Sequence, residues 1–256
     1  MGLRKLEPEP VPEPVDPIPE LQFRTIHGYK RAFRIAGSGP ALLLIHGIGD
    51  NSVAWEPVHS RLARRFTVIA PDLLGHGSAP QPTDPAEYRA FEQYVLDQLP
   101  DEQVDAVGFS LGARTLLILA SAAPERFGRL VVAGVGANLF RRDGASAELA
   151  NALEQGDESN PLVHHFSQLA ASCGQSVDTL VAVLRRPDPP LVDAELLGRV
   201  TNETVVVLGD RDFAGPADPL MGALPNARLV TLRNVDHFST PKAMGFLDAG
   251  LTHLDI

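Results

Sequence analysis

The amino-acid sequence predicts an α/β protein with a mostly parallel, eight-stranded sheet, helices on both faces of the sheet and a small inserted helical cap. Continuous apolar runs such as 41–45 and 204–208 are typical of strands buried on both faces, as in parallel sheets. Helix-like segments separate most of these runs, and such strand–helix–strand units form right-handed crossovers. The alternation is interrupted once, over 139–200, which indicates an insertion.

The composition fits one large globular domain. The chain has 256 residues, of which 44% are hydrophobic and 21% are charged, enough for a full core. Its net charge of −10 argues against nucleic acid or an anionic membrane as the main partner. A small-molecule partner and a monomer or homodimer are expected, although neither follows from the charge.

The sequence also indicates the compartment. No apolar run approaches the roughly 18 residues of a membrane span, and the N-terminus lacks the pattern of a signal peptide. The single Cys173 excludes an intramolecular disulfide, so a reducing compartment suits the chain. These features predict a cytoplasmic protein.

Residues 1–20 are expected to form an acidic, proline-rich tail outside the core. Over 7–20, proline recurs at almost every second position with acidic residues between, a composition that favours extended polyproline II backbone. A solvated tail is favoured over a segment that docks a partner.

The core is expected to comprise residues 21–138 and 201–256. Its first element is an antiparallel hairpin, because residues 21–35 form two strand-like stretches on either side of Gly28. Six further strands are predicted at 41–45, 66–70, 104–109, 130–135, 204–208 and 228–232. Amphipathic and helix-start patterns predict the helices of the core at 53–65, 84–99, 111–123, 217–224 and 241–254.

Residues 139–200 are predicted to form the helical cap. Helical patterns cover 146–155, 160–172, 176–186 and 192–199, with no buried strand between them. The segment follows one predicted strand and precedes another. An insertion is therefore favoured over helices that simply cover the sheet.

The sequence Gly108-Phe109-Ser110-Leu111-Gly112 joins a strand-like run to a helix-like pattern. A Gly-x-Ser-x-Gly stretch in this context predicts a tight turn that holds the serine in a strained conformation. The hydroxyl of Ser110 would then lie near a helix N-terminus, whose amides stabilise a developing anion. The alternative is a turn of small residues with an ordinary serine.

Two further residues follow predicted strands and complete a catalytic set with Ser110. Asp212 comes shortly after 204–208, and His237 comes shortly after 228–232. Because ligands of open α/β sheets bind outside the carboxyl ends of the strands, these side chains should face one crevice. His237 is the candidate base for the serine proton, and Asp212 would fix its tautomer.

These features resemble the α/β-hydrolase fold over nearly all of residues 21–256. The matching motifs are His46-Gly47-Ile48-Gly49, Pro71-Asp72-Leu73-Leu74-Gly75-His76-Gly77-Ser78, Gly108-Phe109-Ser110-Leu111-Gly112, Gly209-Asp210-Arg211-Asp212 and Asp236-His237-Phe238. The chain order of serine, acid and histidine is also that of this family. A serine at the nucleophile position, where dehalogenases and epoxide hydrolases of the fold have Asp, implies hydrolysis of a carboxylic ester through an acyl-serine intermediate.

The resemblance also implies how the substrate is held. The backbone amides of Ile48 and Leu111 are expected to form the oxyanion hole. No metal or organic cofactor is implied. The residues expected to line the substrate pocket are Gly47, Phe109, Trp55 and Phe238.

Alternatives remain for individual residues. Asp210 could replace Asp212 as the acid, although the family spacing favours Asp212, and Asp143 matches another acid position only loosely. His46 and His76 are expected to brace loops rather than to react. The carboxylate of Asp236, beside the candidate base, is expected to point to solvent.

Alternatives remain for the function as well. A thioesterase, a lactonase or a hydrolase of C–C bonds would use the same three side chains. A protein of the same fold that binds a ligand without catalysing its turnover is a further hypothesis.

Overall fold

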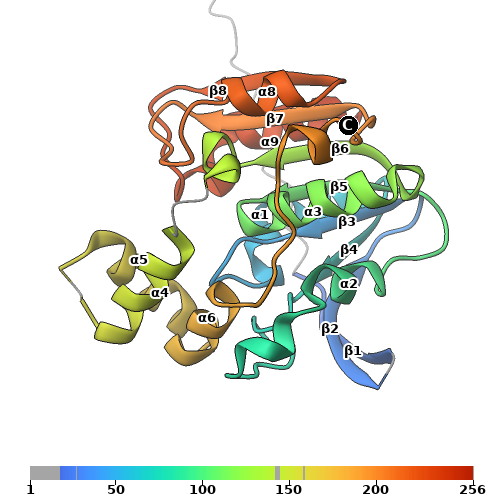
Figure 1. Cartoon of the computed structure of the whole chain (residues 1–256). Coiled ribbons are helices and arrows are strands. Elements are labelled where there is room, and N and C mark those ends of the chain that lie inside the picture. Colours follow the sequence, from blue (N-terminus) through green and yellow to red (C-terminus); the bar gives the residue numbers. More distant parts are fainter. Residues whose placement is uncertain (1–17, 27, 142–144, 158, 256) are drawn as a thin grey trace, which may run out of the picture.

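The computed structural model describes residues 18–26, 28–141, 145–157 and 159–255 (Figure 1). Within these residues the strands are β1 (Leu21–Ile26), β2 (Tyr29–Ala36), β3 (Ala41–Ile45), β4 (Thr67–Pro71), β5 (Val104–Phe109), β6 (Phe127–Ala133), β7 (Thr204–Gly209) and β8 (Ala227–Leu232). They form one eight-stranded sheet in the order β1-β2-β4-β3-β5-β6-β7-β8. Strand β2 pairs antiparallel with β1 and β4, and all other neighbours are parallel. The predicted fold class is confirmed.

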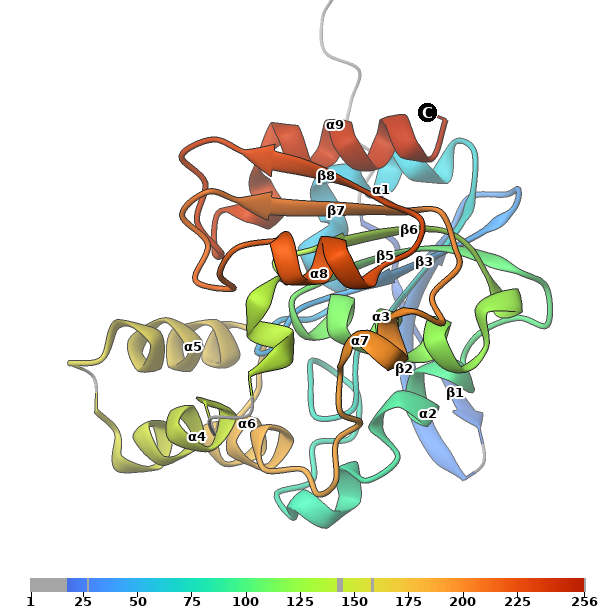
Figure 2. The ribbon, with the colours of Figure 1, turned by 45° about the horizontal axis from the view of Figure 1, so that its top comes forward.

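Helices cover both faces of the sheet (Figures 1 and 2). Helices α1 (Glu56–Ala63) and α9 (Met244–His253) lie on one face. The other face is covered by α2 (Phe91–Leu96), α3 (Leu111–Ala122), α7 (Ala194–Leu197) and α8 (Asp218–Ala223). Successive side chains of a strand point to opposite faces, so Leu42 and Leu44 of β3 pack in one hydrophobic cluster and Leu43 and Ile45 in the other. This double burial explains why the central strands have continuous apolar sequences.

The helices expected over 53–65 and 241–254 each consist of a 3₁₀ turn followed by an α-helix. Two further predicted elements also differ from the structure. The helix expected over 84–99 consists of a 3₁₀ turn, Pro85–Tyr88, followed by α2, because the backbone of Ala90 leaves the helical region with φ −102° and ψ 37°. The strand expected over 130–135 is β6, which begins at Phe127. It ends before Gly134, whose φ of +67° is disfavoured for other residues.

The cap consists of three helices beside the sheet (Figures 1 and 2). They are α4 (Ala145–Gln155), α5 (Pro161–Ser172) and α6 (Val177–Leu184), and they share a small core that includes Leu153, Phe166 and Leu180. By contrast, Leu139 and the stretch 192–200 pack in the hydrophobic cluster of the sheet, which contains Leu196 and Leu197. The segment with its own core is therefore shorter than the predicted cap of 139–200.

Buried polar side chains hold the loops that follow β3 and β4. Both carboxylate oxygens of Asp72 accept backbone N–H groups, from Ser52 and Ser78, each at 2.8 Å. The Leu73 amide donates to His46 Nε2 at 3.1 Å, so Nδ1 carries the proton and donates to the Gly47 carbonyl at 2.8 Å. These bonds fix the backbone beside Ile48.

The predicted tail lies mostly outside the described residues. Its last described part contacts the sheet, where the Arg34 guanidinium donates to the carbonyl of Pro19. Among the described helices, none has the length and apolarity needed to cross a membrane.

His76 should make stability depend on pH. Complete burial, together with the charge of the neighbouring His46, lowers the pKa of His76 to about 3. The unfolded chain protonates this imidazole near pH 6.5, so its contribution to stability is complete above that pH and is lost as the pH falls toward 3. Between pH 7 and pH 5 the expected loss in the free energy of unfolding from this group is up to about 2 kcal/mol.

Urea denaturation at both pH values measures this loss. The variant His76→Asn keeps an amide that can donate to the Leu74 carbonyl, as His76 Nδ1 does, but does not titrate. Its stability should therefore fall less than that of the wild type, by at least about 1 kcal/mol. An equal loss in the free energy of unfolding of the two proteins would contradict the assignment of this pH dependence to His76.

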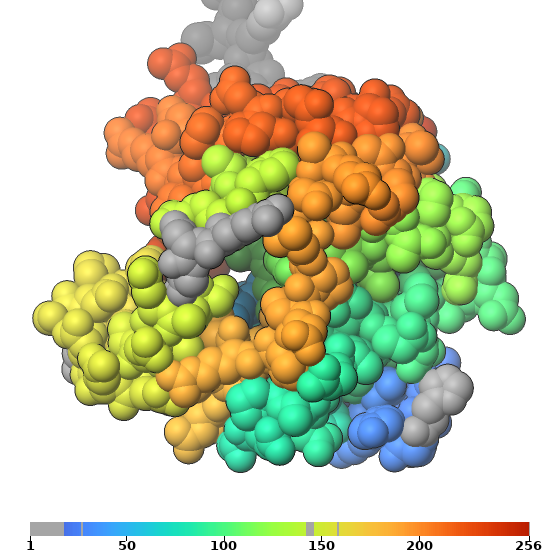
Figure 3. Space-filling model, in the orientation of Figure 1, coloured from blue at the N-terminus to red at the C-terminus, as the bar shows by residue number. Residues whose placement is uncertain are grey.

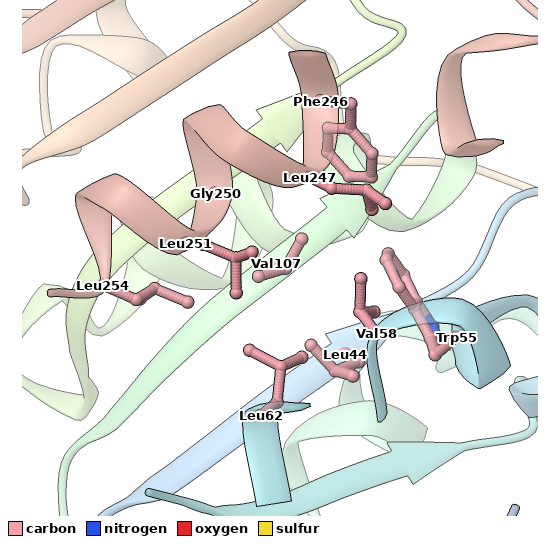
Figure 4. Close-up of a pocket in the computed structure, with 10 residues that line it drawn as sticks. All are labelled: Leu44, Trp55, Val58, Leu62, Val107, Phe246, Leu247, Gly250, Leu251 and Leu254. Atoms are coloured by element: carbon pink, nitrogen blue, oxygen red, sulfur yellow. The ribbon is translucent and has the colours of Figure 1, made fainter. Parts of the chain in front are cut away.

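Gly250 offers a site where stability can be raised. An apolar cavity of about 30 Å³ lies between the sheet and helices α1 and α9, and Gly250 of α9 lines it (Figure 4). A Cβ atom added at Gly250 meets nothing within 4 Å. Replacing a helical glycine by alanine lowers the entropy cost of folding, so Gly250→Ala should raise the free energy of unfolding by about 0.5–1 kcal/mol.

Urea denaturation also tests this substitution. The matched control is Gly222→Ala in α8, where an added Cβ is equally free of contacts but does not enter that cavity. Gly250→Ala should gain at least as much as the control. A loss of stability in Gly250→Ala alone would mean that the cavity cannot take a methyl group.

Candidate active site

Ser110 occupies the turn between β5 and α3 in a strained backbone conformation. Its φ of 51° and ψ of −113° are rare for a residue with a side chain. Two hydrogen bonds hold the turn: Ser110 N–H donates to the Ala133 carbonyl at 2.8 Å, and Arg114 N–H donates to the Ser110 carbonyl at 2.9 Å. The strain is therefore stabilised by the neighbouring strand β6 and by the first turn of α3.

Glycine is required on both sides of this serine. A Cβ atom at Gly108 would lie 2.7 Å from the Gly112 carbonyl oxygen, and one at Gly112 would lie 2.2 Å from the carbonyl oxygen of Ile45 in β3. Real Cβ atoms do not approach backbone so closely. Glycine is needed at both positions because α3 lies in close contact with β5 and β3.

Three side chains from distant parts of the chain meet at this turn. Ser110 Oγ lies 2.9 Å from His237 Nε2, and His237 Nδ1 lies 2.9 and 3.1 Å from the two carboxylate oxygens of Asp212. An ionised carboxylate only accepts, so Nδ1 carries the proton and Nε2 is free to accept from the serine hydroxyl. The loops after β7 and β8 supply Asp212 and His237, as expected from their positions after the predicted strands.

The imidazole and the carboxylate are shielded from water. His237 is 3% exposed and Asp212 8% exposed. The rings of Phe109 and Phe213 pack against the imidazole, with centroids 5.0 and 4.2 Å from its own. Asp212 also accepts the N–H of Ala214 at 2.8 Å, which fixes its carboxylate.

The alternative acids that the structure describes lie away from the imidazole ring. Asp210 is exposed, and its carboxylate accepts the N–H of Asn234 at 2.7 Å. Asp143 lies outside the described residues. Asp236 is exposed, as expected, and hydrogen bonds from the hydroxyl and N–H of Ser239 lower the pKa of its carboxyl. Of the three described acids, Asp210, Asp212 and Asp236, Asp212 is the one whose carboxylate is hydrogen-bonded to the imidazole.

A cavity of about 340 Å³ opens beside the serine and is lined by Ser110, Ile48 and Leu111. Figure 3 shows the surface hollowed between the yellow-green segment after β6 and the orange segment after α6. Gly47 lies next to this cavity, since a Cβ atom there would be 3.5 Å from Ser110 Cβ. The expected oxyanion-hole residues are thus beside the serine.

None of the four expected pocket residues is among the described residues that line this cavity. Phe109 lies behind the imidazole, and Phe238 stacks on His165 of the cap with ring centroids 3.6 Å apart. The placement of Trp55 in the pocket is wrong. Its indole lies on the opposite face of the sheet, 6.4 Å from the ring of Phe246, in the apolar cavity of Figure 4. An amphipathic pattern shows that a side chain is buried, but not against which face of the sheet.

Two arginines that line the cavity, Arg114 and Arg186, belong to no motif in the sequence. The position of Arg114, four residues after Ser110, is a usable signal, because residues four apart share one side of a helix. Nothing in the pattern predicts Arg186. Among the described residues, no group of three or more His, Cys, Asp or Glu side chains is arranged to hold a metal ion.

The chain is similar in sequence to known proteins. A protein of Mycobacterium tuberculosis without an assigned activity is 54% identical over 121 residues, which cover 46% of this chain and 36% of that protein. The match thus spans about a third of the length of this relative. The pimeloyl-[acyl-carrier protein] methyl ester esterase of Nitrosomonas europaea is 27% identical over 230 residues, covering 78% of this chain and 90% of that enzyme.

Solved structures extend the likeness over nearly the whole chain. A hydrolase from Pseudomonas aeruginosa superposes with a TM-score of 0.70 at 26% identity and covers 92% of this chain and 98% of its own. The family model for the alpha/beta hydrolase fold matches residues 40–180, which include the strained serine and its flanking glycines. The chain therefore belongs to the α/β-hydrolase-fold family.

Proposed function

We propose that the protein is a serine hydrolase that cleaves carboxylic esters through an acyl-serine intermediate. The observation that carries this proposal is the continuous hydrogen-bonded chain from Ser110 Oγ through His237 to Asp212. The name of the Nitrosomonas relative, a methyl ester esterase, supports an ester as the bond that is cleaved. A hydrolase is the coarser conclusion that the family itself supports.

In the proposed first half-reaction, His237 Nε2 takes the hydroxyl proton while Ser110 Oγ attacks the ester carbonyl carbon. The tetrahedral intermediate collapses when His237 returns the proton to the leaving oxygen, which departs as an alcohol. Water then attacks the acyl-serine by the same route and releases the acid. Asp212 stays ionised and stabilises the imidazolium that forms in each half-reaction.

The negative oxygen of the tetrahedral intermediate needs donors beside Ser110. Leu111 is the first residue of α3, so its N–H has no acceptor within the helix. The positive end of the helix dipole lies at the same point. Ile48 lines the same cavity, and its N–H is the proposed second donor. Loss of one such donor typically costs about 10²–10³ in turnover.

Replacing the nucleophile tests the proposal directly. Ser110→Ala should lower kcat/KM for p-nitrophenyl butyrate by roughly 10³-fold or more, because no other hydroxyl occupies the turn. A fluorophosphonate probe should add one label to the wild type, and mass spectrometry of the digest should place it on Ser110. Equal rates in the two proteins would remove Ser110 from the mechanism, and an unlabelled wild type would favour a ligand-binding module without turnover.

Replacing the acid tests which carboxylate orients the base. Asp212→Asn keeps the shape of the side chain but favours the wrong imidazole tautomer, so kcat should fall by roughly 10³–10⁴-fold. Asp210→Asn is the matched control in the same loop, and its kcat should stay within about threefold of the wild type. The reverse ranking of the two variants would assign the acid to Asp210.

The same three side chains serve other acyl-transfer reactions, so the bond that is cleaved has to be measured. A panel of an aryl ester, an aryl thioester, a lactone and a vinylogous 1,5-diketone separates the esterase from a thioesterase, a lactonase and a hydrolase of C–C bonds. The proposal expects the highest kcat/KM with the ester.

A further inference from the structure

The cavity beside Ser110 is positively charged. Of the residues that line it, Arg114, Arg141 and Arg186 are cationic, and none of its described lining residues is acidic. The remaining wall is apolar or uncharged and includes Leu139, Leu184 and residues 189–192. This charge contrasts with the net charge of −10 of the whole chain. The cavity is therefore a local exception to the acidic character of the protein.

Arg114 and Arg186 share a single carboxylate behind the cavity wall. Arg114 Nη1 lies 3.5 Å from Glu92 Oε1, and Arg186 Nη2 lies 3.6 Å from the same oxygen. Both separations are too long for charge-assisted hydrogen bonds, which have lengths of about 2.7–2.9 Å. The two guanidinium groups and the one carboxylate together have a net charge of about +1 at neutral pH.

Burial makes this excess charge costly without a further partner. The Arg186 side chain is 9% exposed and packs against the ring of Phe91, with Cζ 4.9 Å from the ring centroid. Within the described chain, Arg186 Nε and Arg114 Nη1 have no hydrogen-bond partner. Burial and the charge of Arg186 lower the pKa of Arg114 to about 10, which still leaves the guanidinium charged at neutral pH. Arg186 Nε and Arg114 Nη1 are both buried, and of the other donors Arg114 Nη2 bonds the Pro190 carbonyl and Arg186 Nη1 the Val183 carbonyl at 3.4 Å. It is therefore the excess positive charge, rather than these two buried donors, that favours an anion in the cavity.

The position of the pair relative to Ser110 defines which part of a substrate it contacts. Arg114 lies four residues after Ser110, a rise of roughly 6 Å along α3. The carbonyl oxygen of the substrate is assigned to Ile48 and Leu111, which line the same cavity as the arginines. We assign the acyl chain, rather than the alcohol group, to the part of the cavity that the arginines line.

We propose that Arg114 and Arg186 form a subsite for a carboxylate at the far end of the acyl chain, so that the preferred substrates are monoesters of dicarboxylic acids. This inference rests on the proposed function and specifies its substrate class. Guanidinium groups suit the role, since they stay charged at neutral pH and form charge-assisted hydrogen bonds with carboxylates. Glu92 competes with the substrate carboxylate for the same two cations.

The experiment compares two esters that differ only in charge. The anionic ester is the mono-p-nitrophenyl ester of adipic acid, and the neutral ester is the same compound with its free carboxylate methylated. The wild type should prefer the anionic ester in kcat/KM by roughly tenfold or more, as expected for a charge-assisted hydrogen bond in a shielded site. Arg186→Met should bring the ratio close to one, whereas Arg186→Lys should retain part of it.

Two further variants separate the subsite from general effects of charge. Arg185→Met is the matched control, because Arg185 is the neighbouring arginine but pairs with Glu154 at 2.6 Å on the surface of the cap. It should keep the wild-type ratio. Glu92→Gln should raise the ratio, because it removes the competing carboxylate, whereas a merely structural role of Glu92 predicts no gain. Melting temperatures of all variants identify any that are misfolded.

The outcomes distinguish this inference from the proposed function. Turnover of both esters with equal kcat/KM, or equal effects of Arg185→Met and Arg186→Met on the ratio, overturns the subsite but leaves the hydrolase intact. If neither ester is cleaved and the probe does not label Ser110, the proposed function fails. The subsite is then judged by calorimetric binding of monomethyl adipate. Binding that is lost in Arg186→Met supports it, and absence of binding by the wild type overturns it.

Discussion

The contact of α3 with β3 and β5 is the constraint on which the site depends. A helix that begins directly after a strand and packs against the neighbouring strand leaves no room for Cβ atoms at Gly108 and Gly112. It also holds Ser110 at a positive φ, a conformation that costs on the order of 1–3 kcal/mol. The buried leucines of α3, such as Leu116 and Leu117, anchor the helix in the main core and offset this cost. The position of the serine hydroxyl is thus set by core packing rather than by the loop itself.

The same parallel sheet explains why the other two side chains reach the serine. β7 and β8 lie beside β6 in parallel register, so the loops that follow them leave the sheet at the edge where β5 ends. Burial of Asp212 and His237 weakens competition from water, and the bond from Ala214 N–H holds the carboxylate in place. Asp210, two residues earlier, remains at the surface. Neighbouring acids in one short loop therefore have different environments, and only one contacts the imidazole.

The sequence predicted what depends on local pattern and on the order of elements. Continuous apolar runs located the central strands, and the glycine spacing located Ser110, because both follow directly from close packing. Trp55 shows what such patterns do not predict. The amphipathic pattern around it indicates burial, but only the three-dimensional path of the chain determines that its indole packs near Phe246 of α9 rather than in the cavity beside Ser110. The group of Arg114, Arg186 and Glu92 was not predictable for a related reason. Its members come from α3, from the segment after α6 and from α2, and no periodic pattern links them.

The core and the cap contribute differently to the candidate site, because its reacting side chains and the walls of its cavity come from different segments. The core alone supplies Ser110, His237 and Asp212, while the cap contacts Phe238, the residue after His237, through His165. The segment after α6 closes one side of the cavity, and it is tied to the core where Arg114 Nη2 donates to the Pro190 carbonyl at 2.5 Å. Arg114 belongs to α3, the helix that positions the serine. The segment after α6 is therefore bonded to the same helix as the nucleophile. In the proposed function, the sheet and α3 therefore set the reaction class, whereas the proposed carboxylate subsite selects the substrate where the segment after the cap meets α3.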